Sequence, residues 1–218
     1  MNIAYLADIM KDYNLDQIQL RVRKIWMQDF AKFCKNELGE TSAEVMSHLL
    51  NFESDCRSIQ IIANSLNFKE SSDASRREQK REKYMANLGY LYPERYDKLV
   101  KVTNNRDLKE ALEGTDYSRL LQDASMDEGQ QMNEAEDTKT QLDDVMLHEQ
   151  SRQYSMAFEN GFHFGVFYSY LKLKELEIKN VTWIAELVSL DCSRALPGWN
   201  KYTVPFKYHR NNANGTYE

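Results

Sequence analysis

The amino-acid sequence predicts an all-α fold, and three observations support this prediction. Only 8 Gly and 3 Pro occur in 218 residues, which leaves few positions for the tight turns of a β-sheet. Leu, Met, Glu, Lys, Gln and Ala are abundant, and these residues favour helices. Apolar residues also recur at spacings of three and four, the pattern of amphipathic helices. The longest such stretch covers residues 162–190 and predicts the clearest helix of the chain.

Composition argues against several protein classes. The formal charge of −6 argues against a general nucleic-acid binder, which carries a basic face. The three cysteines are far apart and form no CxxC pair, so a zinc site or a disulfide framework is poorly supported and a reduced, cytosolic setting is expected. We expect no signal peptide at the N-terminus. No apolar run reaches the roughly 18 residues of a membrane span, so we expect no direct membrane span.

The first part of the chain reads as helices. Residues 3–36 predict one or two helices that end near Gly39. A capping box formed by Thr41 and Glu44 then predicts a helix that runs to about Leu66. The face expected to be buried in the first helical region consists of Ile18, Val22, Ile25, Trp26, Asp29, Phe30, Phe33 and Cys34.

The middle of the chain is more polar. Residues 70–83 hold a basic cluster, interpreted as a solvated loop leading into a short helix, with an acidic protein partner as the alternative. The cluster consists of Arg76, Arg77, Lys80, Arg81 and Lys83. Residues 88–93 break the pattern. Short helices are predicted at 94–102 and 105–113, the second capped by Asn104 or Asn105, and a further turn at 117–121.

The last part begins with an acidic segment, residues 123–144. It is interpreted as a flexible loop, with calcium binding a weaker alternative because the EF-hand order of ligands is absent. A helix resumes at about Thr138 and ends at Asn160-Gly161, and the 162–190 helix follows. A short extended segment at 202–206 and a polar tail at 207–218 complete the chain.

One charge pattern occurs twice, in residues 49–63 and 171–185. Both segments read acid, any, acid, any, base, small polar, β-branched, any, apolar, Ile, Ala. A duplicated helical unit would produce this pattern, although coincidence among charged helices is the alternative. The charges either face solvent or dock the two units against one another. The candidate interaction residues are Glu53, Asp55, Arg57, Glu175, Glu177, Lys179, Asn180 and Trp183.

The sequence contains none of the common catalytic or nucleotide-binding motifs. His148 and Glu149 do not form HExxH, and no GxxxxGK[ST], GxGxxG or GxSxG motif occurs. His163 lies among aromatic residues and is expected to be a satisfied core or boundary residue rather than a metal ligand. Glu53 and Asp55 are two positions apart, which places them on different sides of a helix. We therefore expect no catalytic residue, cofactor or metal.

Several segments, taken in order, resemble the subunit d family of vacuolar-type (V-type) proton-pumping ATPases. These segments are DFAKFC at 29–34, TSAEVM at 41–46, LLNFESD at 49–55, LGYLYP at 88–93, AFENGFHFGVFY at 157–168, EIKN at 177–180, WIAE at 183–186 and YTVPF at 202–206. No single segment is a chemical signature, but their ordered series is hard to reach by chance. The series spans nearly the whole chain.

The resemblance implies an all-helical, funnel-shaped body of three similar lobes and a non-catalytic role. In that family the subunit sits on the cytosolic face of the proteolipid c-ring, in vacuolar, lysosomal or other endomembranes. It receives the central shaft, subunits D and F, and passes torque from the shaft to the ring. Part of its surface meets the large stator subunit a. A helical adaptor that kept the fold without a role in the pump is the alternative.

The chain also departs from the family pattern. It resembles the C-terminal part of a member and lacks roughly the first two-fifths, so we expect one lobe to be missing or supplied by a separate chain. Residues 1–70 and 138–206 are then expected to form two similar helical lobes, joined by residues 71–137 and followed by the tail at 207–218. Cys56 stands where the family usually has Arg, and Lys172 and Lys174 replace usual arginines.

Overall fold

A computed structural model describes residues 15–67, 74–126, 134–159 and 161–189. Helices α2 to α9 are found in these residues and no strand occurs among them, which confirms the all-α prediction. The chain divides into two compact units, Met1–Val145 and Met146–Glu218, and helix α8 crosses the boundary. The predicted lobes and the predicted boundaries at 70, 137 and 206 stay predictions.

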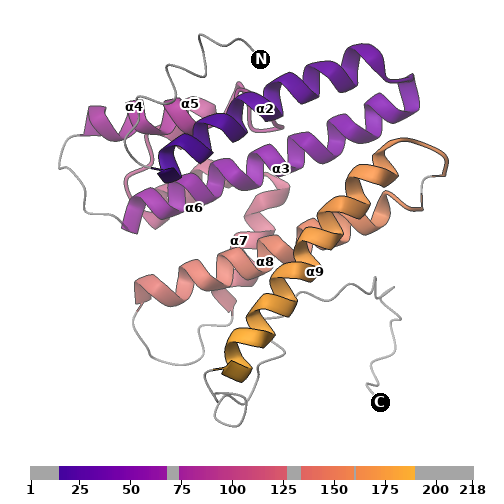
Figure 1. Ribbon diagram of the computed structural model, residues 1–218. Coiled ribbons are helices and arrows are strands. Elements are labelled where there is room, and N and C mark those ends of the chain that lie inside the picture. The colour runs from indigo at the N-terminus through magenta and orange to yellow at the C-terminus, as the bar shows by residue number, and fades with distance from the viewer. Residues whose placement is uncertain (1–14, 68–73, 127–133, 160, 190–218) are drawn as a thin grey trace. The chain divides into compact units, whose positions relative to one another are not determined.

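A long helical hairpin forms the centre of the first unit. Helices α2 (Leu15–Glu37) and α3 (Glu40–Asn67) run antiparallel, joined by a short turn at Leu38 and Gly39 (Figure 1). The predicted capping box is misplaced, because α3 already begins at Glu40 and Ala43 N–H donates to the carbonyl of Gly39. The buried apolar side chains of the hairpin are Met27, Cys34, Met46, Leu49, Leu50, Phe52, Cys56, Ile59 and Ile62.

The buried face of α2 is narrower than predicted. Met27 and Cys34 are buried, whereas Trp26 and Phe33 are 41% and 51% exposed. Met27 follows Trp26 and points about 100° further round the helix, so only one of the two can face α3. The aromatic rings instead stack along α2, with centroids 5.2 Å apart for Trp26 and Phe30 and 6.2 Å apart for Phe30 and Phe33.

Four short helices follow the hairpin: α4 (Ala74–Tyr84), α5 (Tyr96–Val100), α6 (Asn105–Leu112) and α7 (Asp116–Met126). Helices α4 and α5 lie beside the end of the hairpin where α2 begins and α3 ends (Figure 1), whereas α7 reaches the middle of α3 through Tyr117. The buried apolar side chains of the four short helices include Leu99, Val100, Leu108, Ala111, Leu112, Tyr117, Leu120 and Leu121. These helices match the predicted short helices, with ends that differ by a few residues.

The start of α6 confirms the predicted cap. The Asn104 side chain accepts a hydrogen bond of 2.8 Å from the N–H of Asp107. In return, the Asp107 carboxylate accepts from the N–H of Thr103 at 3.0 Å and from its hydroxyl. These hydrogen bonds lower the pKa of Asp107. Two free donors at the helix start are thereby satisfied within four residues.

The acidic segment is more helical than predicted. Helix α7 continues to Met126 and α8 (Glu134–Met156) begins before the predicted position at Thr138. Residues 127–133, the centre of the predicted loop, lie outside the described residues, as do residues 190–218 with the predicted extended segment and tail. In the second unit, Gly161 takes a positive φ of 88° in the turn after α8, as the predicted Asn-Gly turn requires.

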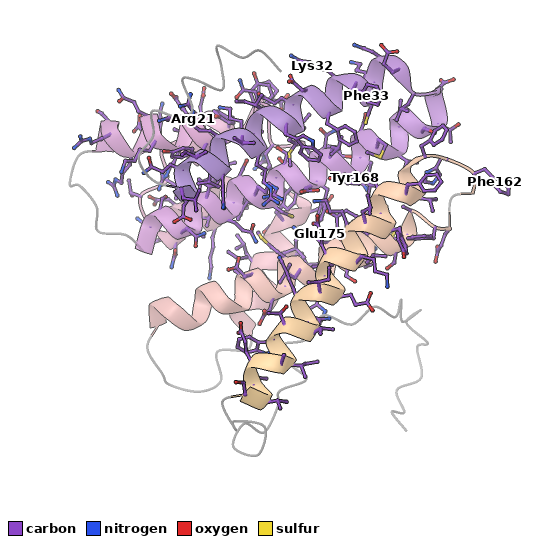
Figure 2. The ribbon with its side chains drawn as sticks, in the orientation of Figure 1. Arg21, Lys32, Phe33, Phe162, Tyr168 and Glu175 are labelled. Carbon is purple, nitrogen blue, oxygen red and sulfur yellow. The ribbon has the colours of Figure 1, made fainter. Side chains whose placement is uncertain are left out.

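Helix α9 (Gly165–Ser189) confirms the helix predicted from 162–190, but its buried face is much smaller than predicted. Apolar residues occur almost all round α9, and the turn and α8 can cover only one side of it. Leu176 and Leu187 are buried, and Tyr154 of α8 meets Tyr168 edge to face. Phe162 projects away from the start of α9 (Figure 2). Exposed apolar residues of α9 are Phe167, Tyr170, Leu171, Ile178, Val181, Trp183, Ile184 and Val188.

The cap of α6 gives a first testable prediction. Replacing Asn104 with Ala removes the acceptor for the N–H of Asp107, and we expect the free energy of unfolding to fall by about 1 kcal/mol. Urea denaturation followed by circular dichroism measures this change. Asn105→Ala, one position inside the helix and exposed, is the matched control and should change stability by less than about 0.5 kcal/mol. Equal effects of both changes would contradict the capping role.

Candidate interaction site

The first set of predicted residues lies inside the protein, in contrast to the solvated face considered as an alternative. Glu53 and Asp55 are buried on α3 and Arg57 is partly exposed. Arg57 donates to the Glu53 carboxylate through Nη2 at 2.8 Å and Nε at 3.2 Å. Phe52, Cys56 and Ile59 are buried on the same helix, so α3 meets neighbours on most of its circumference and both acids are enclosed.

Asp55 is the point where three segments meet. Its carboxylate accepts hydrogen bonds from the N–H of Tyr90 at 2.8 Å, the N–H of Leu91 at 3.3 Å and the hydroxyl of Tyr117 at 2.8 Å. The neighbouring Ser54 donates to the carbonyl of Leu88 at 2.6 Å. One turn of α3 therefore fixes the LGYLYP segment and the start of α7 at once.

Burial controls the electrostatics of this cluster. Desolvation raises the pKa of Asp55 from 3.8 to about 6, although the three donors favour the charged carboxylate and oppose the rise. The pKa of Tyr117 is also raised, first by its own burial and then by the Asp55 charge. The Tyr117 hydroxyl therefore stays protonated and remains a donor to Asp55 throughout the physiological pH range.

Gly89 makes the close approach to Asp55 possible. Its φ of +125° is a conformation that residues with a Cβ rarely adopt. A Cβ added to Gly89 would lie 2.0 Å from Oδ1 of Asp55, far inside contact distance. The glycine thus allows the backbone N–H groups of Tyr90 and Leu91 to reach the carboxylate.

Arg81 was predicted to be part of a solvated basic cluster, and this prediction is wrong. Its side chain is buried and donates from Nη1 to the carbonyls of Val100 at 2.7 Å and Val102 at 2.5 Å, and from Nε and Nη2 to the hydroxyl of Ser65. It satisfies the carbonyl of Val100, the last residue of α5, which has no partner within the helix, and the carbonyl of Val102 two residues beyond. Burial lowers its pKa.

Arg95 has a similar role, which the sequence analysis did not identify. It donates from Nη1 to the carbonyls of Ala111 at 3.1 Å and Glu113 at 2.7 Å at the end of α6. No local sequence signal separates Arg81 or Arg95 from the solvated arginines. For Asp55 a signal existed, because Phe52, Asp55, Ile59 and Ile62 follow the 3-4-3 spacing of one buried face.

The second set of predicted residues lies on α9. Glu175 and Lys179 are exposed, Glu177 and Asn180 are partly exposed, and Trp183 is 37% exposed. Ion pairs on this helix join Lys172 to Glu175 at 3.3 Å and Lys174 to Glu177 at 2.5 Å, rather than Glu175 to Lys179. Exposed pairs of this kind contribute little to stability.

The two sets belong to different units, so contact between them stays a prediction. The repeated charge pattern nevertheless occupies two different environments. On α3 the acids are enclosed and hydrogen bonded, whereas on α9 most of the corresponding residues face solvent.

His163 is buried as predicted, but it is only partly satisfied, because its Nδ1 has no hydrogen-bond partner among the described residues. It is buried in the turn between α8 and α9, and its Nε2 lies 2.9 Å from the carbonyl of Ala157. Within the described ranges, no group of three or more His, Cys, Asp or Glu side chains could hold a metal ion. Each helix in the described part of the chain is too short or too polar to cross a lipid bilayer.

Comparison with known proteins decides the family. The model of the ATP synthase (C/AC39) subunit family matches residues 3–196. The chain belongs to this family. Its similarity to V-type proton ATPase subunits d confirms the resemblance noted in the sequence.

Three relatives illustrate this similarity. V-type proton ATPase subunit d of Dictyostelium discoideum is 33% identical over 208 residues, covering 93% of this chain and 53% of the relative. Subunit d1 of Arabidopsis thaliana is 32% identical over 184 residues, covering 84% and 48%. Subunit d of Saccharomyces cerevisiae is 29% identical over 184 residues, covering 84% and 47%. The chain thus spans about half the length of the relatives it matches.

The contact between Gly89 and Asp55 gives a second prediction. Gly89→Ala should lower the free energy of unfolding by about 3 kcal/mol or more, because strain at positive φ adds to a clash with the carboxylate. Gly114→Ala is the matched control, since Gly114 has φ of +73° but only an ordinary contact of 3.8 Å to Arg95. It should cost about 1–2 kcal/mol from strain alone. Urea unfolding measures both, and equal losses would contradict the close packing on Asp55.

The raised pKa of Asp55 gives a third prediction. Because its folded pKa of about 6 exceeds the unfolded value near 3.8, the folded state binds this proton more tightly. The resulting stabilisation is present below pH 4 and is lost as pH rises to 6, a change of about 3 kcal/mol. The difference in unfolding free energy between the parent and Asp55→Asn, measured from pH 4 to 7, isolates this group from other carboxylates. A difference that stays constant with pH would contradict the assignment.

Proposed function

We propose that this protein is a non-catalytic central-stalk subunit of a V-type ATPase. It couples the rotating shaft, subunits D and F, to the membrane proteolipid c-ring and so supports ATP-driven proton transport. Its further partner is the large stator subunit a, and its location is the cytosolic face of an endomembrane. The observation that carries the proposal is the family match over residues 3–196, together with relatives that are subunits d of V-type proton ATPases.

The first unit has a construction that suits the transmission of torque. A body that passes torque between partners must keep its loops fixed relative to its helices. Asp55, Arg81 and Arg95 each bind two backbone groups of another segment. Satisfied polar contacts of this kind specify a single arrangement of packed elements. These polar side chains thus serve to hold the structure, which agrees with a scaffold role.

The chain covers only about half the length of its relatives, so the rest of the family fold must be present for a complete subunit to assemble. Relatives are about twice as long as the matched region. We propose that the apolar residues exposed on α9 form part of the contact surface with the remaining lobe of the family fold. The charges of Glu177 and Lys179 are proposed to orient lobes rather than to stabilise them, since exposed pairs contribute little free energy.

Co-purification tests this proposal. The full chain, carrying an affinity tag and expressed at its natural level, should bring down proteolipid and shaft subunits in stoichiometric amounts from solubilised membranes, as measured by quantitative mass spectrometry. Gly89→Ala at the same expression level should bring down less, because the first unit is destabilised. An untagged strain provides the background.

Two results would contradict the proposal. Recovery of folded protein without any pump subunit would favour the helical adaptor. Recovery of pump subunits in amounts equal to the untagged background would do the same. The sequence of a co-purified chain would also show directly whether the remaining lobe comes from a second polypeptide.

A further inference from the structure

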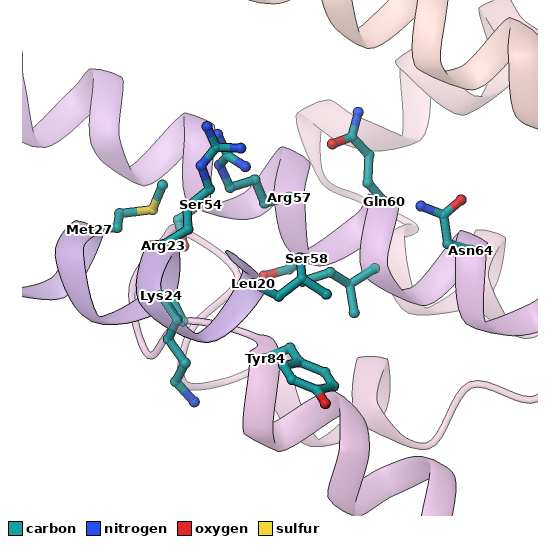
Figure 3. Close-up of a pocket in the computed structure, with 12 residues that line it drawn as sticks. Leu20, Arg23, Lys24, Met27, Ser54, Arg57, Ser58, Gln60, Asn64 and Tyr84 are labelled. Carbon is teal, nitrogen blue, oxygen red and sulfur yellow. The ribbon is translucent and has the colours of Figure 1, made fainter. Parts of the chain in front are cut away.

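A small pocket lies between α2 and α3 in the first unit (Figure 3). Its volume is about 120 Å³, and side chains of both helices and of Tyr84 line it. Apolar side chains, Leu20, Met27 and Ile61, form part of the lining, and polar side chains are placed among them. The polar side chains include Arg23, Lys24, Arg57, Ser58, Gln60 and Asn64.

Two guanidinium groups give the pocket its charge. Arg23 is exposed on α2 and makes no hydrogen bond or ion pair with another described residue. Arg57 is held by the buried Glu53 through Nε and Nη2, so its Nη1 group remains available. Figure 3 shows both side chains rising toward the same side of the pocket. Glu53 offsets the charge of Arg57, so Arg23 carries the uncompensated positive charge, and an anion beside both groups would accept hydrogen bonds from each.

Lys24 does not belong to this pair. Its side chain extends away from the two arginines, and its Nζ donates to the carbonyl of Glu82 at 2.7 Å. The charge on the arginine side therefore comes from two fork-shaped donors, and such donors match the planar geometry of a carboxylate.

The size of the pocket limits the ligand. Pockets for drug-sized ligands or cofactors occupy about 300–1,000 Å³, whereas this one has about 120 Å³. A nucleotide is too large for it, but a single Asp or Glu side chain fits.

An aromatic surface continues from this pocket along α2. Arg23, Trp26, Phe30 and Phe33 are spaced three, four and three residues apart, which places them on one face of the helix. Trp26 and Phe33 are exposed, and their rings stack with Phe30 between them. From Arg23 to Phe33 the face extends for about 15 Å. A basic pocket at one end of an apolar face complements a segment that carries an acid next to apolar residues.

We propose that the pocket between α2 and α3 binds a carboxylate side chain from a partner protein. The carboxylate belongs to a short amphipathic segment whose apolar residues lie on Trp26, Phe30 and Phe33. Arg23 and Arg57 donate to the acid from the same side of the pocket, and Glu53 fixes the direction of Arg57. This goes beyond the proposed function, because it assigns a surface and a partner chemistry and holds for any assembly that contains the chain.

Site-specific photo-crosslinking tests the pocket. A benzophenone amino acid replaces Gln19, which is exposed one turn before Arg23 and does not line the pocket. The full chain is expressed at its natural level, and crosslinked peptides are identified by mass spectrometry after irradiation of intact cells. We expect the crosslink to map to a partner segment within a few residues of an Asp or Glu. Arg23→Glu should reduce the crosslink yield at least tenfold, and the milder Arg23→Gln should reduce it about threefold.

Lys32→Glu is the matched control. Lys32 is exposed on α2 and does not line the pocket (Figure 2). Its replacement by Glu changes the charge by the same amount as Arg23→Glu. It should leave the crosslink yield within twofold of the parent. Thermal melting should show that Arg23→Glu, Arg23→Gln and Lys32→Glu are folded like the parent.

A charge swap completes the test. Replacing the mapped partner acid with Arg should abolish the crosslink in the parent and restore it in Arg23→Glu. Four results would overturn the proposal: no crosslink, equal yields in the parent and Arg23→Glu, an equal loss in Lys32→Glu, or a crosslink only to the acidic segment of the same chain. Loss of the crosslink with millimolar inorganic phosphate but no effect of the charge swap would identify a free-anion site and also overturn it. Co-purification of pump subunits is scored separately, so failure of the pocket is distinguishable from failure of the proposed function.

Discussion

The enclosed carboxylate of Asp55 is the interaction on which the first unit depends. Taking a carboxyl group out of water costs free energy unless hydrogen bonds replace the lost water. Here the donors come from the backbone of the 88–93 segment and from Tyr117, segments 35 and 62 residues away in the chain. Each donor reaches Asp55 only when its own segment is folded against α3. The cost of burying the carboxylate is therefore offset only when the 88–93 segment and α7 are both in place. The acid therefore specifies how α3, the LGYLYP segment and α7 fit together, a role better supported for buried polar groups than net stabilisation.

Much of the secondary structure could be predicted from the sequence. Periodic apolar residues identified α2, α3 and α9, and Asn104 identified the start of α6, because these signals are local. The sequence did not identify which face of α2 is buried, since Trp26 and Met27 are both suitable core residues and only the position of α3 decides between them. It also did not separate Arg81 from its solvated neighbours, because the carbonyls that it binds lie about 20 residues further along the chain.

For the candidate interaction residues too, the sequence predicts the local pattern but not which side chains are buried. The repeated acid-acid-base pattern selected Glu53, Asp55 and Arg57, and the solvated interpretation of its two acids is wrong because both are buried. On α9 the corresponding residues are largely exposed and pair with lysines three positions earlier. Charge spacing on a helix defines which side chains are neighbours. It does not define whether another element covers them, and that depends on segments far away in the sequence.

The contact between Gly89 and Asp55 also constrains how this protein can change during evolution. A larger residue at position 89 collides with the carboxylate of Asp55. Position 89 therefore cannot accept a side chain while Asp55 stays unchanged. A descendant that replaces Gly89 must also replace Asp55 with a smaller residue, before or at the same time. It then loses the hydrogen bonds to Asp55 that fix the 88–93 segment. Positions 55 and 89 should therefore vary as a correlated pair among descendants of this sequence, because most single substitutions at one of them would destabilise the protein.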